Sequence, residues 1–294
     1  MSGADPAARA AAAEAALAAA AAEAALVERT FQLELVLEVL RNRDRAAAEQ
    51  AEWDFAAELQ RAGLPQEFPP FPDRNDFDLH AGMVTAKEVG GDLYDFFLLD
   101  SDRLGFTVAD AAGKGLPAAI FITLMRTLLK AAAFRLDDPG QCLRTVNAML
   151  SLNNPSLMFA TAFYGVLDLA TGSLRYANAG HNAPYILRAR GGLEAAPRVG
   201  DMALGVVEDS AYRTRSLSLA PGDALVCYSD GVTDAIDPAG TLFGEVRLED
   251  CLARQTSRHP TDLLGAVIAE VDQYMSLAPM ADDVTLLVLR YNGR

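Results

Sequence analysis

Apolar and polar residues alternate in several short segments of this chain, which predicts β-strands. Phe77–Val84 alternates most clearly, and the other predicted strands are short apolar runs at 93–99, 104–109, 159–167, 174–179, 185–187, 213–219, 224–228 and 286–289. Polar or glycine-containing turns, such as 100–102 and 168–172, separate neighbouring strands and predict hairpins.

Longer apolar stretches predict helices at 116–134, 141–152, 245–255 and 261–276. These helices are inserted in pairs, centrally and near the end, so the order of elements excludes a regularly alternating βαβ fold. Two antiparallel sheets stacked face to face, with helices outside, would bury all of these faces. The pattern therefore predicts an α+β fold of this layered kind.

The N-terminal quarter has a different pattern. Residues 1–25 are mostly alanine, which favours helix but offers little area to bury, so we expect this stretch to be poorly ordered. Residues 26–64 predict a helix whose apolar patch, Phe31–Leu40, needs a partner surface. That surface is either the domain that follows or a second chain in a coiled-coil-like homodimer, and we favour the dimer. The proline-rich stretch 68–72 marks the boundary, so the main domain is expected at 72–294.

Composition excludes several classes of protein. A net charge of −15 without a basic run argues against a nucleic-acid partner. Three cysteines without CxxC spacing and three scattered histidines argue against a disulfide framework and a zinc site, so a bound metal would need carboxylate ligands. The N-terminus lacks a basic n-region and its alanine runs are too weakly apolar to span a bilayer. We therefore expect a soluble, cytoplasmic protein without a membrane span.

Acidic residues recur at the ends of the predicted strands. Asp92 begins one strand of a predicted hairpin and Asp110 ends the other, so both should lie at the same end of the pair. Asp230, and Asp282 with Asp283, occupy similar places beside small residues. One such aspartate is ordinary turn chemistry. Four such points in one domain predict a two-metal hydrolytic centre, in which carboxylates hold two hard cations that share and activate a water.

Five motifs in order carry a family resemblance: Glu-Val-Gly-Gly-Asp92, Asp110-Ala-Ala-Gly-Lys-Gly, Asn178-Ala-Gly-His-Asn, Ser-Asp230-Gly-Val-Thr-Asp and Asp282-Asp-Val-Thr. From about residue 60 to the C-terminus, the chain resembles the metal-dependent protein phosphatases of the 2C type, in the bacterial branch that contains SpoIIE and RsbU. The resemblance implies an α/β/β/α sandwich that hydrolyses phosphoserine or phosphothreonine. In some members of this branch, the helices after the position of Asp110 act as a regulatory switch.

The resemblance also implies roles for individual residues. Asp110 would bridge two Mn²⁺ or Mg²⁺ ions, with the backbone carbonyl of Ala111 as the adjoining ligand. Asp92 would contact the metal or the water that it binds, and Asp230 and Asp282 would be the remaining ligands on the opposite metal.

Other positions keep two interpretations. Asp283 is either a residue that supports the ligands or a ligand of a third ion. Lys87 lies where many relatives have a phosphate-binding arginine, and lysine lacks the bidentate fork of arginine. His181 is either catalytic or part of a structural turn. Gly113-Lys-Gly115 lacks the residues of a nucleotide-binding P-loop, so that interpretation is rejected.

The resemblance implies a phosphorylated protein substrate. In this branch it is a small anti-sigma-factor antagonist of the STAS type in a partner-switching pathway. An activating protein that binds the N-terminal helix is a further expected partner. Two alternatives stay open, a catalytically weak or inactive signalling adaptor of the same fold and another two-metal hydrolase such as a phosphodiesterase.

Overall fold

The computed structural model of the protein describes residues 50–294, apart from 153 and 199. The chain divides into two compact units, Met1–Phe55 and Ala56–Arg294. Residues 50–55 of the first unit are helical, and 56–63 of the second unit are helical as well. The predictions for 1–25 and for the apolar patch Phe31–Leu40 lie outside the described residues. The description below concerns the second unit.

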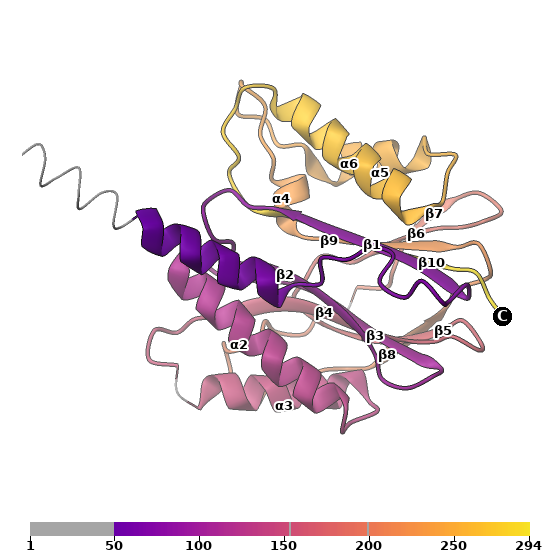
Figure 1. Cartoon of the computed structure of the whole chain (residues 1–294), viewed down its shortest axis with the longest axis horizontal. Coiled ribbons are helices and arrows are strands. Elements are labelled where there is room, and N and C mark those ends of the chain that lie inside the picture. Colours follow the sequence, from indigo (N-terminus) through magenta and orange to yellow (C-terminus); the bar gives the residue numbers. More distant parts are fainter. Residues whose placement is uncertain (1–49, 153, 199) are drawn as a thin grey trace, which may run out of the picture. The chain divides into compact units, whose positions relative to one another are not determined.

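The strands of this unit form two five-stranded sheets in which all neighbours are antiparallel (Figure 1). The first sheet has the order β1 (Phe77–Val84), β10 (Val284–Tyr291), β9 (Ala224–Tyr228), β6 (Tyr185–Leu187) and β7 (Leu193–Ala195). The second has the order β2 (Asp92–Leu98), β3 (Arg103–Ala111), β4 (Ala160–Asp168), β5 (Ser173–Ala179) and β8 (Arg215–Ser218).

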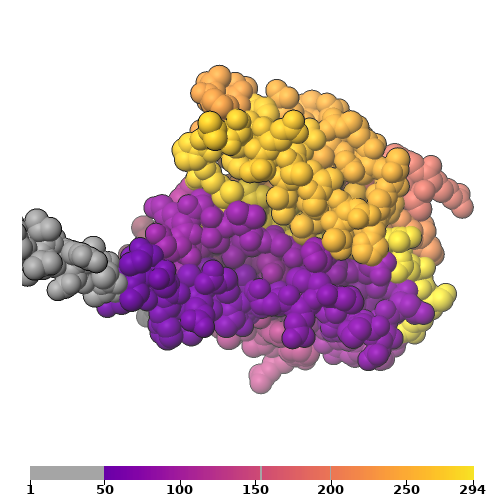
Figure 2. Space-filling view, turned by 45° about the horizontal axis from the view of Figure 1, so that its top comes forward, coloured from indigo at the N-terminus to yellow at the C-terminus, as the bar shows by residue number. Residues whose placement is uncertain are grey.

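Helices cover the outer face of each sheet. The second sheet packs against α2 (Leu116–Ala133) and α3 (Pro139–Ser151), and the first against α5 (Gly244–Ala253) and α6 (Pro260–Met275). A one-turn helix, α4 (Asp230–Thr233), follows β9. Figure 2 shows the C-terminal helices, coloured orange to yellow, as a layer on one side of the unit. This arrangement confirms the predicted α/β/β/α sandwich.

The interior strand β10, which lies between β1 and β9, shows why the sequence forms layers. Its residues alternate between two apolar clusters, so that Leu287 and Leu289 face the interior between the sheets while Leu286 and Val288 face α5 and α6. Both sets are fully buried. Since each strand residue points to the opposite face from its neighbour, an unbroken apolar run fits a strand covered on both faces.

Helix α2 is the one described helix that is long and apolar enough to cross a membrane, and 44% of its residues are buried in the unit. A core helix of a soluble protein meets the same criteria. Met125 and Leu129, for example, pack in the cluster between the layers. The cytoplasmic location stays a prediction.

Three local features differ from the sequence expectations. The strand β7 was not predicted, because Leu-Glu-Ala is short and contains no β-branched or aromatic residue; it forms a strand by pairing with β6. Asp230 begins a helical turn rather than a simple turn after a strand. The proline-rich stretch 68–72, expected to be a joint, packs on the first sheet, with the rings of Phe68 and His80 4.3 Å apart.

Candidate active site

Asp92 and Asp110 are direct cross-strand partners in the β2–β3 hairpin, as the sequence predicts. Asp92 is only 2% exposed, and its Oδ2 has no hydrogen-bond partner among the described residues. Burial, followed by the charge of Asp110, raises the pKa of Asp92 well above its ordinary value, and the hydroxyls of Ser229 and Thr285 offset this only in part. The pair is therefore a site of unfavourable negative charge.

The opposite sheet brings further carboxylates to this edge. Burial, and then the charges of Asp230 and Asp282, raise the pKa of Asp110 to about 7. The pKa of Asp230 is raised as well, first by burial and then by Asp234 and Asp282. Asp230 follows Ser229, whose backbone N–H and side-chain Oγ both bond to Thr285 of β10. Strand ends from both sheets thus place their carboxylates within electrostatic reach of one another.

Asp283 has a different environment from its neighbour Asp282. Its Oδ1 accepts a hydrogen bond from the N–H of Ala86 and its Oδ2 accepts one from the N–H of Gly91, both at 2.7 Å. The side chain is buried, and burial raises its pKa. Asp283 therefore holds the loop at 86–91, which leads into Asp92.

A metal fits this set of groups. Within the described residues, no three acidic, histidine or cysteine side chains are already close enough to enclose an ion. However, carboxylate and carbonyl oxygens are the ligands that Mg²⁺ and Mn²⁺ prefer, and the buried Oδ2 of Asp92 needs a partner. A side chain at Gly91 would place its Cβ 3.0 Å from the carbonyl oxygen of Ala111, so any larger residue at this position would crowd that oxygen.

Sequence reasoning missed two residues that contact this site. Lys114 forms an ion pair with Asp282, with 3.0 Å between Nζ and Oδ2. Gln60, on the helix at 56–63, holds the backbone of Gly90 with two hydrogen bonds: its Nε2 donates to the carbonyl oxygen at 2.7 Å, and its Oε1 accepts from the N–H at 2.9 Å. The one available signal for Lys114 was its place in Gly113-Lys-Gly115, at the end of the Asp110 motif. Nothing in the sequence pairs Gln60 with Gly90.

The remaining candidates lie differently. Lys87 is exposed and forms no hydrogen bond or ion pair with the described residues. His181 is 8% exposed, its Nδ1 lies 2.8 Å from Oγ1 of Thr161, and its backbone is fixed by two hydrogen bonds to the side chain of Asn178. Burial lowers the pKa of His181 to about 4, so the ring is neutral near pH 7. These contacts are those of a buried turn, although Thr161 is also the cross-strand partner of Asp110.

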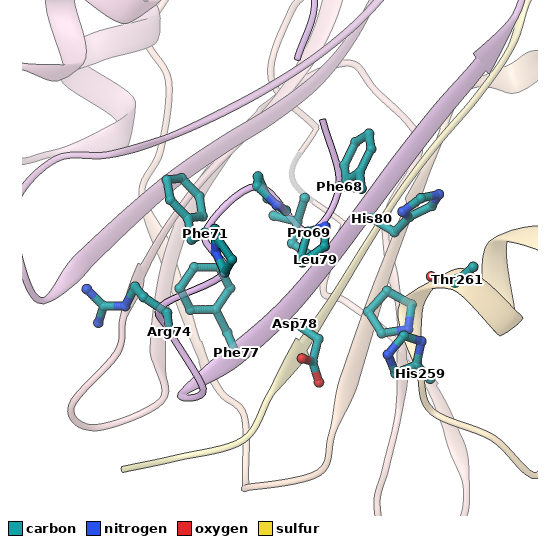
Figure 3. Close-up of a pocket in the computed structure, with 13 residues that line it drawn as sticks. Phe68, Pro69, Phe71, Arg74, Phe77, Asp78, Leu79, His80, His259 and Thr261 are labelled. Carbon is teal, nitrogen blue, oxygen red and sulfur yellow. The ribbon is translucent and has the colours of Figure 1, made fainter. Parts of the chain in front are cut away.

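The acidic edge is separate from a large pocket elsewhere on the first sheet. This pocket has a volume of about 540 Å³ and lies between the proline-rich segment, β1 and the start of α6. Figure 3 shows its aromatic rings, with His80 and His259 at one end. The five clustered carboxylates are those of Asp92, Asp110, Asp230, Asp282 and Asp283, and none of them lines this pocket. The cavity that Asp92 lines measures only about 30 Å³, room for about one water.

Comparisons with known proteins identify the family. The family model for stage II sporulation protein E (SpoIIE) matches residues 100–292, more than half of the chain. Protein IcfG of Synechocystis sp. is 31% identical over 258 residues, covering 78% of this chain and 40% of that protein. Phosphoserine phosphatase RsbU of Bacillus subtilis is 27% identical over 243 residues, covering 82% and 70%.

A solved structure agrees. The SiaA-PP2C domain of Pseudomonas aeruginosa has a TM-score of 0.73 and 25% identity, and the match covers 83% of this chain and 98% of that domain. The chain spans less than half of IcfG and 57% of the phosphoserine phosphatase RsbP of Bacillus subtilis. The family match and the shared fold confirm the resemblance that the motifs indicated. The chain belongs to the SpoIIE family of PP2C-type serine/threonine phosphatase domains.

Proposed function

We propose that this protein hydrolyses phosphoserine on a small signalling protein, an anti-sigma-factor antagonist of the STAS type in a partner-switching pathway. The observation that carries the proposal is the meeting of Asp92 and Asp110 from one sheet with Asp230 and Asp282 from the other. Two relatives, RsbU and RsbP of Bacillus subtilis, are named phosphoserine phosphatases. A related structure from Mycobacterium tuberculosis joins an RsbU and an RsbW domain, at 28% identity and a TM-score of 0.64.

Two Mn²⁺ or Mg²⁺ ions are the proposed cofactors. Asp110 would be shared by both, Asp92 and the Ala111 carbonyl would hold one, and Asp230 and Asp282 would hold the other. When bound, the ions would supply the positive charge that activates a water and offsets charge on the phosphoryl oxygens. RsbX, a protein of the same fold, has a solved structure in complex with magnesium.

The other residues would position these ligands. Both oxygens of Asp283 already accept backbone hydrogen bonds, which supports a role in fixing the 86–91 loop over a role as ligand of a third ion. After burial, the charges of neighbouring carboxylates contribute to the raised pKa values of Asp92, Asp110 and Asp230, and a divalent ion would relieve this repulsion. A phosphate-binding role for Lys87 would require its exposed side chain to turn toward the carboxylates.

The proposal is tested by turnover of the full chain on a phosphoserine-bearing STAS-type protein, with p-nitrophenyl phosphate and cyclic nucleotides as rival substrates. We expect Mn²⁺-dependent release of phosphate from the protein, no cyclic nucleotide hydrolysis, and loss of turnover after chelation. Asp110→Asn is the inactive control. Cyclic nucleotide hydrolysis would favour the phosphodiesterase, and no turnover on any substrate would favour the adaptor. Full turnover of the stripped protein in excess chelator would refute the metal-dependent mechanism.

A second part of the proposal is that the 26–64 helix forms a homodimer and receives an activating protein. Its apolar patch at Phe31–Leu40 is outside the described residues, so support comes from the adjoining surface of the second unit. There a groove of about 250 Å³ leaves Leu59 and Ile120 58% and 61% exposed. Light scattering should give a dimer for the full chain and a monomer for a chain that begins at Ala56. The same number of chains per particle in both samples would refute it.

A further inference from the structure

Lys114 occupies the edge of the acidic site. It lies in the turn between β3 and α2, four residues after Asp110. Its Nζ is 3.0 Å from Oδ2 of Asp282 and also donates a hydrogen bond to the carbonyl of Ala281. The side chains of Lys114 and Asp282 are 37% and 38% exposed, so the pair borders solvent. An incoming substrate would therefore meet this ammonium group.

The charge of Lys114 is unusual in its surroundings. Within the described part of the chain, no other basic side chain forms an ion pair with any of the five clustered carboxylates. Its charge also counteracts the raised pKa of Asp230. Lys114 therefore neutralises the same acidic residues that the proposed function assigns to divalent cations.

Competition for Asp282 has a consequence for the lysine. If a divalent ion takes this carboxylate, the ammonium group loses its partner and lies beside additional positive charge. A lysine on a flexible stem can then turn to another anion, and lysine binds phosphate well as a point charge. The phosphoryl group of the substrate is the anion that the reaction brings to this place.

We propose that Lys114 binds a phosphoryl oxygen of the phosphoserine substrate, and that Asp282 holds its side chain at the site until a metal ion takes the carboxylate. This inference rests on the proposed function and deepens it. It assigns phosphate recognition to Lys114 in place of Lys87, whose exposed side chain forms no ion pair with an acidic residue of the described chain.

Calorimetry on the full chain tests the assignment in two steps. Metal-free protein is titrated with MnCl₂, and Mn²⁺-saturated protein is then titrated with inorganic phosphate. The variants are Lys114→Gln, Lys114→Arg and Lys87→Gln. Arg254→Gln is the matched control, since it removes a basic partner from an exposed ion pair with Glu270 on the α5–α6 side.

Lys114→Gln should bind Mn²⁺ about threefold to tenfold more tightly, because a competing cation is gone. It should bind phosphate about tenfold more weakly, because a charged hydrogen-bond donor is gone. In steady-state assays on a phosphoserine peptide, the loss should appear mainly as a raised KM. Lys114→Arg should retain most of the phosphate affinity, and Lys87→Gln and the control should match the wild type in both titrations.

Unchanged phosphate affinity in Lys114→Gln would overturn the inference, and so would a loss confined to Lys87→Gln. Weaker Mn²⁺ binding in Lys114→Gln would also overturn it, since Lys114 would then support the ligands instead of competing with the metal. Each of these three results would leave the proposed function intact, provided that the wild-type protein binds Mn²⁺ and hydrolyses the phosphoserine peptide. A wild-type protein that does neither would overturn the proposed function and this inference together.

Discussion

The hydrogen bonds of Gln60 predict that the helix at 56–63 controls the order of the loop before Asp92. Gln60→Ala removes both bonds to Gly90, which is buried. A neutral hydrogen bond contributes about 0.5–1.5 kcal/mol, so the change should cost about 1–3 kcal/mol. Gln60→Glu should cost at least as much, because an oxygen then replaces the Nε2 donor and faces the Gly90 carbonyl oxygen.

The loss of these two hydrogen bonds should be measurable both as faster hydrogen exchange in the loop and as lower activity. The amides of Gly90 and Gly91 should exchange faster in hydrogen–deuterium exchange of the loop at 86–91. If the whole 1–3 kcal/mol serves to keep the loop in its reactive arrangement, Mn²⁺-dependent turnover of p-nitrophenyl phosphate should fall by about fivefold to a hundredfold. The melting temperature should fall by about 2–12 °C, since about 1 kcal/mol shifts a domain of this size by about 2–4 °C.

Gln66→Ala is the matched control. Gln66 also donates to a backbone carbonyl, that of Arg61, but this bond is exposed and does not involve the loop at 86–91. It should leave loop exchange and turnover unchanged. If Gln60→Ala lowers the melting temperature but leaves loop exchange and turnover at wild-type levels, the two bonds stabilise the packing of the helix without ordering the loop. The reasoning that links this helix to Asp92 would then be wrong.

Three further predictions concern the site and its support. The pKa of Asp110 is raised from 3.8 to about 7, so the native state binds the proton of this carboxyl group more tightly than the unfolded chain does. The free energy of unfolding of the metal-free protein should therefore fall as the pH rises from 3.8 to about 7. Urea unfolding should show a weaker pH dependence in Asp110→Asn. Asp95→Asn should destabilise the fold by about 3 kcal/mol in the same assay, because it leaves Arg126, 2.8 Å from the fully buried carboxylate, without its partner. Gly91→Ala should weaken Mn²⁺ binding by about tenfold in calorimetry, since the new methyl group crowds the Ala111 carbonyl; unchanged affinity would contradict a role for that oxygen.

The pattern of apolar and polar residues predicted most of the fold, because the helices and strands are periodic and well separated along the chain. The prediction for β1 has the bounds that the structure gives, and the hairpin prediction brings Asp92 opposite Asp110. Where the pattern is weak, tertiary context decides. The three residues of β7 form a strand through their partner β6, and Asp230 starts a helical turn where Asp-Gly alone suggests an ordinary turn.

The candidate site was predicted to the extent that its residues share one kind of chemistry. Repeated aspartates at strand ends indicate a common location even before the strands are paired, and the stacked sheets then bring them to one edge. Contacts between unlike groups carry no such signal. Lys114 meets Asp282 across 168 positions, and Asp283 bonds to backbone N–H groups almost 200 residues earlier in the chain. The clustering of the carboxylates could therefore be expected from sequence, whereas the ion pair of Lys114 with Asp282 and the loop that Asp283 holds depend on how the two sheets pack.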